Sequence, residues 1–285
     1  MTSALLAATT CTPQRNCSVT AESHRRGKVA LIIPCHNEAA ALPELERSLA
    51  RLRAALDDRL DLELLLVDDA STDDTAALMK SLFQEWNEIR ILRHESQQGI
   101  AGAIATGLRT ASAPVVASLD ADCTYDPLIL VPMLELLTDD IDLVVASPYH
   151  PDGRVEGVPA WRLRLSRGAS RLYGMVMRNK LHTYTSCVRI YRRDAVIGLS
   201  VRDPGFVGIV ELLWRLDSCG GRIAEHPATL KTRSAGQSKM RVTRATLAHL
   251  GLLSRAALAR FISRQSIVGG DTRGQAHSSE FHHLS

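Results

Sequence analysis

Short apolar runs alternate with segments of helical leucine spacing in the first half of this chain, and this alternation restricts the fold more than any other feature. Apolar runs with the length of buried strands occupy residues 28–34, 62–67, 89–92, 115–122 and 142–147. Between the first two runs, a helix is predicted by the spacing of Leu42, Leu45, Leu49, Leu52 and Leu56. Repeated strand–helix units predict an α/β fold with a mostly parallel central sheet and right-handed crossovers.

One domain is expected over residues 27–240. Its regular half, 27–147, precedes a less regular half, 148–240, with a predicted basic helix at 160–178, a strand near 187–192 and a helix near 207–218. Residues 241–264 are predicted to form an amphipathic helix with one apolar stripe, made of Leu250, Leu253, Ala257 and Phe261. We interpret this helix as a cover for the sheet, although such a helix could also lie on a membrane. Residues 1–26 and 265–285 are expected to be disordered.

Composition argues against several classes of function. Lys and Arg number 34 against 31 Asp and Glu, an excess too small to indicate a nucleic-acid partner. The six cysteines form no Cys-x-x-Cys pair, so neither a zinc site nor a disulfide framework is indicated. No signal peptide is recognised, and no apolar run approaches the roughly 18 residues needed to cross a bilayer. We therefore expect a cytoplasmic protein, with peripheral contact with the membrane left open.

Two carboxylates one residue apart, Asp120 and Asp122, end the fourth predicted strand. Ligands of open α/β sheets collect beyond the carboxyl ends of the strands. Side chains two residues apart on a strand point the same way, so both carboxylates can face one hard cation and its diphosphate. No Gly-x-Gly-x-x-Gly pattern follows the first strand and the chain has no Walker lysine motif, which disfavours an NAD site or an ATPase.

Four motifs in this order resemble the family-2 inverting glycosyltransferases: IPCHNE (33–38), VDDAS (67–71), GIAGA (99–103) and DAD (120–122). Four later motifs resemble the dolichyl-phosphate mannosyltransferase branch of that family: SPY (147–149), VEG (155–157), WRLRLSRG (161–168) and TSCVRIYR (185–192). The resemblance covers roughly residues 28–240. It implies a GT-A fold that binds a nucleotide sugar, GDP- or UDP-hexose, together with Mg²⁺ or Mn²⁺.

The resemblance also implies roles for residues of the first half. The nucleotide sugar would contact Pro34, His36, Glu38, Val67, Asp69, Asp120 and Ala121. The metal would be held by Asp120, Asp122 and Thr124. This chain has His36 where the family usually has Tyr, and Thr124 where it often has Gln. Thr124 supplies an oxygen that is a weaker ligand or acts through water.

For the acceptor, the resemblance implies a phosphate-binding Arg162 and Ser166, four residues apart on one face of the basic helix. The segment 233–239 matches the family's loop over the diphosphate. Its Ser238 is assigned to the acceptor, and Lys239 and Arg241 to the nucleotide sugar. The chain departs from the family at three further positions, with Pro148 for an Arg, Thr183 for an Asp and Cys187 for a Gly.

The resulting hypothesis is a metal-dependent inverting transfer of a hexose, with mannose or glucose favoured, to a polyprenyl phosphate. A phosphate acceptor is already anionic and needs no general base, whereas a hydroxyl acceptor does. Glu211 is the candidate base, although a structural helix residue is the favoured interpretation. Pro148 leaves open transfer to a soluble, glycan or protein hydroxyl. His36 and Thr124 leave open a non-catalytic nucleotide-binding protein.

Overall fold

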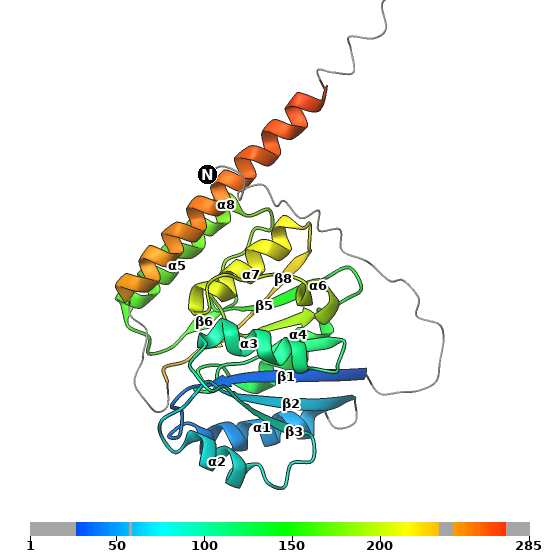
Figure 1. Ribbon diagram of the computed structural model, residues 1–285, viewed down its shortest axis with the longest axis vertical. Coiled ribbons are helices and arrows are strands. Elements are labelled where there is room, and N and C mark those ends of the chain that lie inside the picture. Colours follow the sequence, from blue (N-terminus) through cyan, green and yellow to red (C-terminus); the bar gives the residue numbers. More distant parts are fainter. Residues whose placement is uncertain (1–26, 57–58, 234–241, 272–285) are drawn as a thin grey trace, which may run out of the picture.

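A seven-stranded mixed sheet forms the centre of the protein, with the strand order β3-β2-β1-β4-β7-β5-β8 (Figure 1). The computed structural model describes residues 27–56, 59–233 and 242–271, with side chains described only for 246–260 in the last range. The strands of the sheet are β1 (Gly27–Cys35), β2 (Leu60–Asp68), β3 (Ile89–Arg93), β4 (Val115–Ser118), β5 (Leu143–Ser147), β7 (Arg189–Arg192) and β8 (Ile223–Pro227). Two short strands, β6 (Arg154–Val155) and β9 (Thr229–Leu230), pair in parallel beside it.

Strand direction brings the carboxyl ends of six strands to one edge of the sheet. β1 pairs in parallel with β2 and β4, β2 with β3, and β5 with β8, which confirms the predicted mostly parallel α/β fold. β7 is antiparallel to both β4 and β5, so those two strands run in the same direction. The carboxyl ends of β1, β2, β4 and β5 therefore lie together, as the ligand edge of such a sheet requires.

Helices cover both faces of the sheet. They are α1 (Leu42–Leu56), α2 (Thr75–Leu82), α3 (Gly99–Thr110), the 3₁₀ turn η1 (Pro127–Ile129), α4 (Leu130–Glu135), α5 (Ala160–Val176), α6 (Arg193–Ile197), α7 (Phe206–Ser218) and α8 (Val242–Asp271). Because side chains alternate along a strand, Leu31 and Leu64 pack with α1, α2 and α4, while Ile32 and Leu65 pack with α3 and α7. A Cβ on Gly107 would lie 2.5 Å from the Ile32 side chain, so this glycine permits the close approach of α3 to β1.

The predicted elements are present, with differences in where some of them end. The fourth strand ends at Ser118 rather than 122, because the chain turns away from the sheet towards Cys123, whose φ is +55°. The segment that follows is a 3₁₀ turn and then the short α4. The helix after β2 begins at Thr75, whose N–H donates to Asp73 Oδ1 (3.0 Å).

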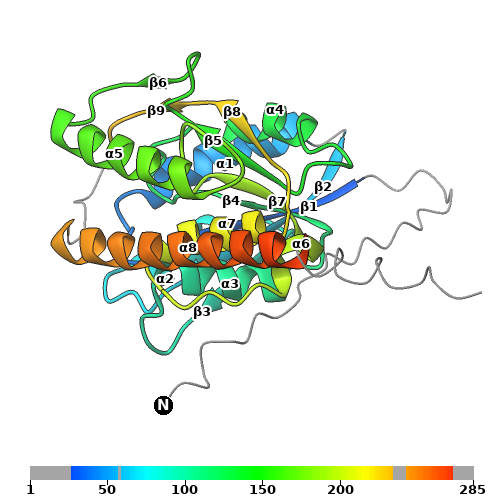
Figure 2. The same ribbon diagram turned by 90° about the horizontal axis from the view of Figure 1, so that it is seen from above.

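The last helix, α8, packs against α5 and α7 rather than directly on the sheet (Figures 1 and 2). It continues to Asp271, past the predicted end at 264 and into the segment expected to be a disordered tail. Its buried residues are Leu252 and Ala256, whereas Leu250 of the predicted stripe is 51% exposed and Ala257 is also exposed. The side chain of Phe261 lies outside the described residues, as do residues 1–26 and 272–285.

Polar anchors set the register of α8. His249 Nδ1 lies 2.9 Å from the Tyr173 hydroxyl of α5, and Arg255 pairs with Glu211 of α7 at 3.2 Å. Arg260 Nη1 donates to the main-chain oxygen of Met175 at 2.9 Å. Within the described residues, no helix combines the length and the apolar character that a membrane span requires.

Candidate active site

Three of the loops at the ligand edge contain a non-glycine residue in the left-handed backbone region. They are Asn37 after β1, Ala70 after β2 and Cys123 after β4, with φ of 53°, 55° and 55°. Asn adopts this conformation comparatively easily, but for Ala and Cys it costs free energy that the surrounding contacts must supply. Strain of this kind concentrates at functional sites. Ala70 and Cys123 carry no sequence signal that predicts it.

Hydrogen bonds fasten the loop after β1 to the loop after β2. Asn37 Oδ1 accepts from the N–H of Thr72 (2.7 Å), and the N–H of Asn37 donates to Ser71 Oγ (2.9 Å). His36 Nδ1 lies 2.8 Å from the main-chain oxygen of Asp69. These bonds hold two predicted nucleotide contacts, His36 and Glu38, at the edge of the sheet, where Pro34 is also partly exposed.

Asp69 is a buried anchor for α3. Its Oδ1 accepts from the N–H of Gln98 and from His94 Nδ1, and its Oδ2 accepts from the N–H of Gly99, all at 2.7 Å. A carboxylate at a helix N-terminus is stabilised by the free N–H groups there. This geometry favours a structural role over the predicted contact with a base. The side chain of Val67 is likewise buried in the core, so only its main chain could face a ligand.

The loop after β4 brings Asp120 and Asp122 next to other charged groups. Asp122 Oδ1 accepts from the N–H of Thr124 (3.1 Å), and its Oδ2 accepts from Arg233 Nε (2.8 Å). Arg233 Nη2 lies 3.3 Å from Glu38 Oε1. Burial and the neighbouring charge of Asp122 raise the pKa of Asp120 to about 7. Two carboxylates that repel each other in this way suit a hard divalent cation, which would stabilise both charged forms.

Among the described residues, no group of three or more His, Cys, Asp or Glu side chains is arranged to hold a metal ion. Asp120 and Asp122 would therefore need further oxygen ligands. Thr124 lines the same cavity as Asp120, and water or a diphosphate could complete the coordination. The predicted donor set fits Mg²⁺ or Mn²⁺ on these terms.

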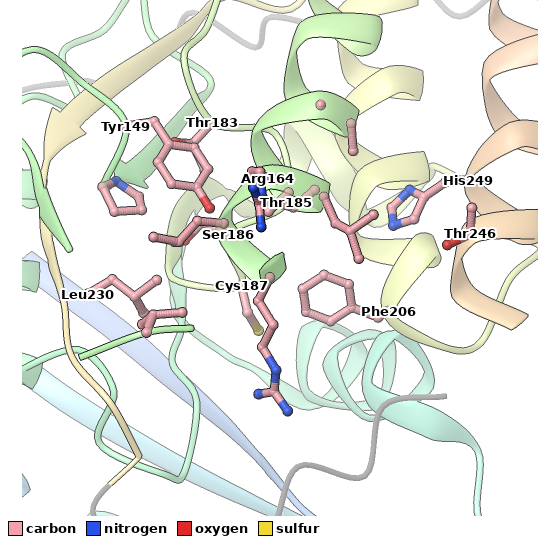
Figure 3. Close-up of a pocket in the computed structure, with 18 of the residues that line it drawn as sticks. Tyr149, Arg164, Thr183, Thr185, Ser186, Cys187, Phe206, Leu230, Thr246 and His249 are labelled. Atoms are coloured by element: carbon pink, nitrogen blue, oxygen red, sulfur yellow. Dashed lines mark hydrogen bonds between the residues drawn. The ribbon is translucent and has the colours of Figure 1, made fainter. Parts of the chain in front are cut away.

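A cavity of about 480 Å³ runs from Asp120 and Thr124 to the space between α5 and α8 (Figure 3). Arg162 and Ser166 of α5 line it, so the structure brings the predicted acceptor residues and Asp120 to one cavity. Ser166 Oγ lies 2.9 Å from Thr185 Oγ1. Arg162 Nε is buried and has no hydrogen-bond partner among the described residues, which leaves a donor for an anion.

The far part of the cavity has mainly apolar walls. They are formed by Trp161, Leu165 and Leu172 of α5, Phe206 of α7, and Leu250 and Leu253 of α8. Figure 3 shows Thr246 and His249 of α8 across the cavity from Ser186 and Cys187. Sequence reasoning missed this wall, because no motif connects α8 to the predicted site.

Three of the positions at which the chain departs from the family also lie at this cavity. Pro148, Thr183 and Cys187 all line it. Burial and the neighbouring charge of Asp120 raise the pKa of the Cys187 thiol. Thr183 is buried and its Oγ1 accepts from Ser147 Oγ at 2.8 Å. Arg233, which was predicted only as part of a loop, is the cation nearest to the acidic pair in the part of the chain that the structure describes.

The surroundings of Glu211 favour a structural role over that of a general base. Its carboxylate is fully buried on α7, where Oε2 accepts from the N–H groups of Arg202 (3.0 Å) and Asp203 (3.1 Å), and Oε1 pairs with Arg215 and Arg255. Burial alone would raise the pKa of Glu211, but these hydrogen bonds and guanidinium charges outweigh it and lower the pKa below its ordinary value. The residue therefore stays ionised and has a structural role, as the favoured interpretation of the sequence stated.

Three predicted site residues lie outside the described residues: Ser238, Lys239 and Arg241. Their assigned roles stay predictions. The described chain stops at Arg233, immediately before this segment, and resumes at Val242.

The sequence has relatives among characterised proteins. It is 29% identical over 217 residues to dolichol-phosphate mannosyltransferase of Pyrococcus furiosus, a match that spans 75% of this chain and only 59% of that protein. It is 30% identical to undecaprenyl-phosphate mannosyltransferase of Micrococcus luteus, over 75% of this chain and 87% of that one. It is 31% identical to polyprenol monophosphomannose synthase of Mycolicibacterium smegmatis, over 75% and 81% of the two chains.

Solved structures share the fold. Glucosyl-3-phosphoglycerate synthase of Mycobacterium tuberculosis, crystallised with Mn²⁺, UDP and glucosyl-3-phosphoglycerate, has a TM-score of 0.53 at 24% identity, over 84% of this chain and 80% of that chain. The mannosyltransferase PcManGT of Pyrobaculum calidifontis, in complex with GDP-Man and Mn²⁺, has a TM-score of 0.54 at 16% identity, over 86% and 76%. These neighbours confirm the expected GT-A fold. Residues 30–199 match the family model described as Glycosyl transferase family 2, and the chain therefore belongs to that family.

Proposed function

We propose that this protein transfers a hexose from a nucleotide sugar to a polyprenyl phosphate. One observation carries the proposal: a single cavity joins Asp120 to Arg162 and Ser166, and then continues between apolar walls of α5 and α8. An acceptor with an anionic head and an apolar tail requires polar and apolar surfaces in this order. The names of the relatives from P. furiosus, M. luteus and M. smegmatis, which refer to dolichol, undecaprenyl and polyprenol carriers, support the same acceptor class.

On the donor side, Pro34, His36, Glu38 and Ala121 would contact the nucleotide sugar at the edge of the sheet. Asp120, Asp122 and Thr124 would hold Mg²⁺ or Mn²⁺. When bound, such a cation stabilises the negative charge that develops on a departing diphosphate. Lys239 and Arg241, which lie outside the described residues, would bind that diphosphate, as predicted from the sequence.

On the acceptor side, Arg162 would bind the phosphate with its guanidinium N–H groups, and Ser166 would donate a further hydrogen bond. An oxygen of this phosphate forms a bond to the anomeric carbon while the bond from that carbon to the diphosphate breaks, and the electron pair leaves with the nucleoside diphosphate. The attacking oxygen is already anionic, so no proton has to be removed. The engagement of Glu211 in structural contacts agrees with an acceptor of this kind.

The exposed apolar side chains of α5 and α8 support peripheral contact with a lipid surface. The two helices lie side by side (Figures 1 and 2). Their exposed large apolar residues are Trp161, Leu165, Leu172 and Met175 on α5, and Leu247, Leu250 and Leu258 on α8. Exposed Arg164, Arg167 and Arg171 accompany them on α5 and would attract anionic headgroups. A bilayer contact here would place the cavity next to its lipid acceptor.

The test is a transfer assay with radiolabelled GDP-mannose and UDP-glucose, Mn²⁺, and undecaprenyl or dolichyl phosphate in detergent. We expect label to appear in the organic phase. We expect Arg162→Gln to lower kcat/KM for the lipid phosphate by about 10- to 100-fold, the range for one hydrogen-bonded charge. Arg47→Gln, an exposed position on α1 that does not line the cavity, is the control and should leave the rate unchanged.

Other outcomes contradict the proposal in distinct ways. Label found only on water-soluble or protein acceptors would favour transfer to a hydroxyl, the alternative that Pro148 leaves open. Tight binding of a nucleotide without transfer to any acceptor would favour a non-catalytic binding protein.

A further inference from the structure

Three carboxylates and one guanidinium meet at the ligand edge of the sheet. Arg233 Nε donates to Asp122 Oδ2 at 2.8 Å, and its Nη2 lies 3.3 Å from Glu38 Oε1. Asp120 belongs to the same charged group, since its charge and that of Arg233 influence each other. Glu38 follows β1, the two aspartates follow β4, and Arg233 follows β9, so the cation comes from the half of the domain that forms the acceptor side.

Main-chain contacts position Arg233 at the acidic group. The N–H of Lys231 donates to the main-chain oxygen of Thr124 at 2.8 Å, which ties the strand before Arg233 to the loop that carries Asp122. Thr232 Oγ1 donates to the main-chain oxygen of Glu156 at 3.2 Å. Burial disfavours the charged guanidinium, but the charges of Asp122 and Glu38 outweigh it and raise the pKa of Arg233 above its ordinary value.

We propose that Arg233 is a built-in counter-ion that neutralises the acidic group in the metal-free protein and competes with the divalent cation for Asp122. This inference rests on the metal site of the proposed function. A divalent cation bound by Asp122 would lie close to the guanidinium that donates to the same carboxylate, and the two positive charges would repel each other. Binding of the cation therefore favours movement of Arg233 away from Asp122.

The displaced guanidinium needs a new anionic partner, and a nucleoside diphosphate at this edge supplies one. The cation and the nucleotide should therefore bind with positive coupling, because each favours the arrangement that the other requires. In this way Arg233 would weaken the binding of the divalent cation when no nucleotide is bound. It would also deliver a positive charge to the diphosphate only when both ligands are present.

The experiment measures the affinity of the purified full-length protein for Mn²⁺ by electron paramagnetic resonance, without nucleotide and with GDP or UDP. The variant Arg233→Gln removes the charge and keeps hydrogen-bonding capacity. We expect it to bind Mn²⁺ alone about fivefold more tightly than the wild type, as for loss of a partly exposed competing ion pair. The nucleotide should then improve Mn²⁺ binding less in the variant than in the wild type. Arg222→Gln, which removes an exposed partner of Asp140, is the matched control and should change neither value.

The outcomes separate this inference from the proposed function. If the wild type binds no Mn²⁺ under any condition, the metal site itself is wrong. If the wild type and Arg233→Gln bind Mn²⁺ equally, or the variant binds it more weakly while its thermal unfolding is unchanged, the metal site stands and the counter-ion role is overturned. Arg233→Lys, which keeps the charge, should stay close to the wild type and so distinguishes loss of charge from loss of shape.

Discussion

The strand ends after β2 and β4 both carry paired carboxylates, yet the structure uses the two pairs in opposite ways. After β2, Asp68 is fully buried and accepts from the N–H of Ser71 (2.9 Å), and Asp69 accepts three hydrogen bonds around the start of α3. After β4, Asp120 lines a large cavity, and Asp122 shares the guanidinium of Arg233. The first pair is engaged in hydrogen bonds that hold the loops together, whereas the second pair includes a carboxylate that lines the cavity.

The difference shows that a position at a strand end does not by itself make a carboxylate part of a site. The two pairs differ in the hydrogen-bond donors that surround them. Asp69 accepts hydrogen bonds from the free N–H groups at the N-terminus of α3, and these bonds occupy both of its oxygens. Asp120 and Asp122 meet each other, and only one cation lies near them among the described residues. Substitutions at the two pairs should therefore affect different properties: stability at one, activity at the other.

The largest expected effect is on catalysis at Asp122. Asp122→Asn keeps the size of the side chain but removes the charge that a metal ion needs, so we expect hexose transfer to fall by about 10³-fold. The midpoint of thermal unfolding should stay within a few degrees of the wild type. The measurements are a transfer assay and a melting curve. Asp126→Asn, an exposed aspartate on the same loop, is the control; near-normal transfer in Asp122→Asn would remove the metal assignment.

Glu211 extends the comparison, because hydrogen-bond donors occupy both of its oxygens, as they do in Asp69, and because it joins α7 to α8. Glu211→Gln leaves Arg215 and Arg255 without their anionic partner, and we expect the free energy of unfolding to fall by about 3 kcal/mol. The lowered pKa of Glu211 means that its stabilisation is fully present above the ordinary value of 4.5 and is lost as the pH falls through the lower folded-state value. Denaturant titrations at pH 7 and at acidic pH should show the difference between wild type and variant shrinking. Persistence of the full difference in acid would contradict this account.

Elements could be predicted from the sequence where apolar spacing reports burial directly. The helix at Leu42–Leu56 begins and ends as its leucines predict, since all five face the core. The antiparallel direction of β7 could not be predicted, because periodicity carries no information on strand direction. The buried face of α8 could not be predicted either, since contacts from His249, Arg255 and Arg260 to distant elements select it.

The same limit applies to the site. Asp120, Thr124, Arg162 and Ser166 do line one cavity, because the parallel strands and α5 bring their motifs to one edge. Asp69 and Glu211 carry the same chemical group as Asp122, but folding surrounds them with donors from segments far away in the chain. A short sequence motif gives no information on such distant hydrogen-bond donors. A carboxylate's role is therefore decided by tertiary contacts that no local pattern encodes.

Asp69 provides the counterpart of the Asp122 test. In Asp69→Asn, an amide N–H₂ replaces one of the oxygens that accept from Gln98, His94 and Gly99, so two donors face each other in a buried place. We expect the free energy of unfolding to fall by about 2 kcal/mol. The folded fraction should retain transfer activity, since this carboxylate does not reach the cavity. Chemical denaturation with a parallel assay of activity per folded molecule measures both. Loss of nucleotide binding without loss of stability would instead restore the predicted contact with the base.

The smallest change in stability is expected from substitutions on the exposed face of α8. Leu247 and Leu258 are 70% and 52% exposed and do not line the cavity, so replacing both with Ser should change the free energy of unfolding by no more than about 0.5 kcal/mol. If these side chains enter a bilayer, the double variant should nevertheless float less with vesicles that contain anionic lipid, because the apolar area available for insertion is smaller. Leu136→Ser, at an exposed leucine just after α4, is the control. Equal flotation of the wild type, the double variant and Leu136→Ser would contradict insertion of α8 into a bilayer and leave it only as a wall of the cavity. The nucleotide-sugar side and the acceptor side of the site would then differ in chemistry but not in contact with a membrane.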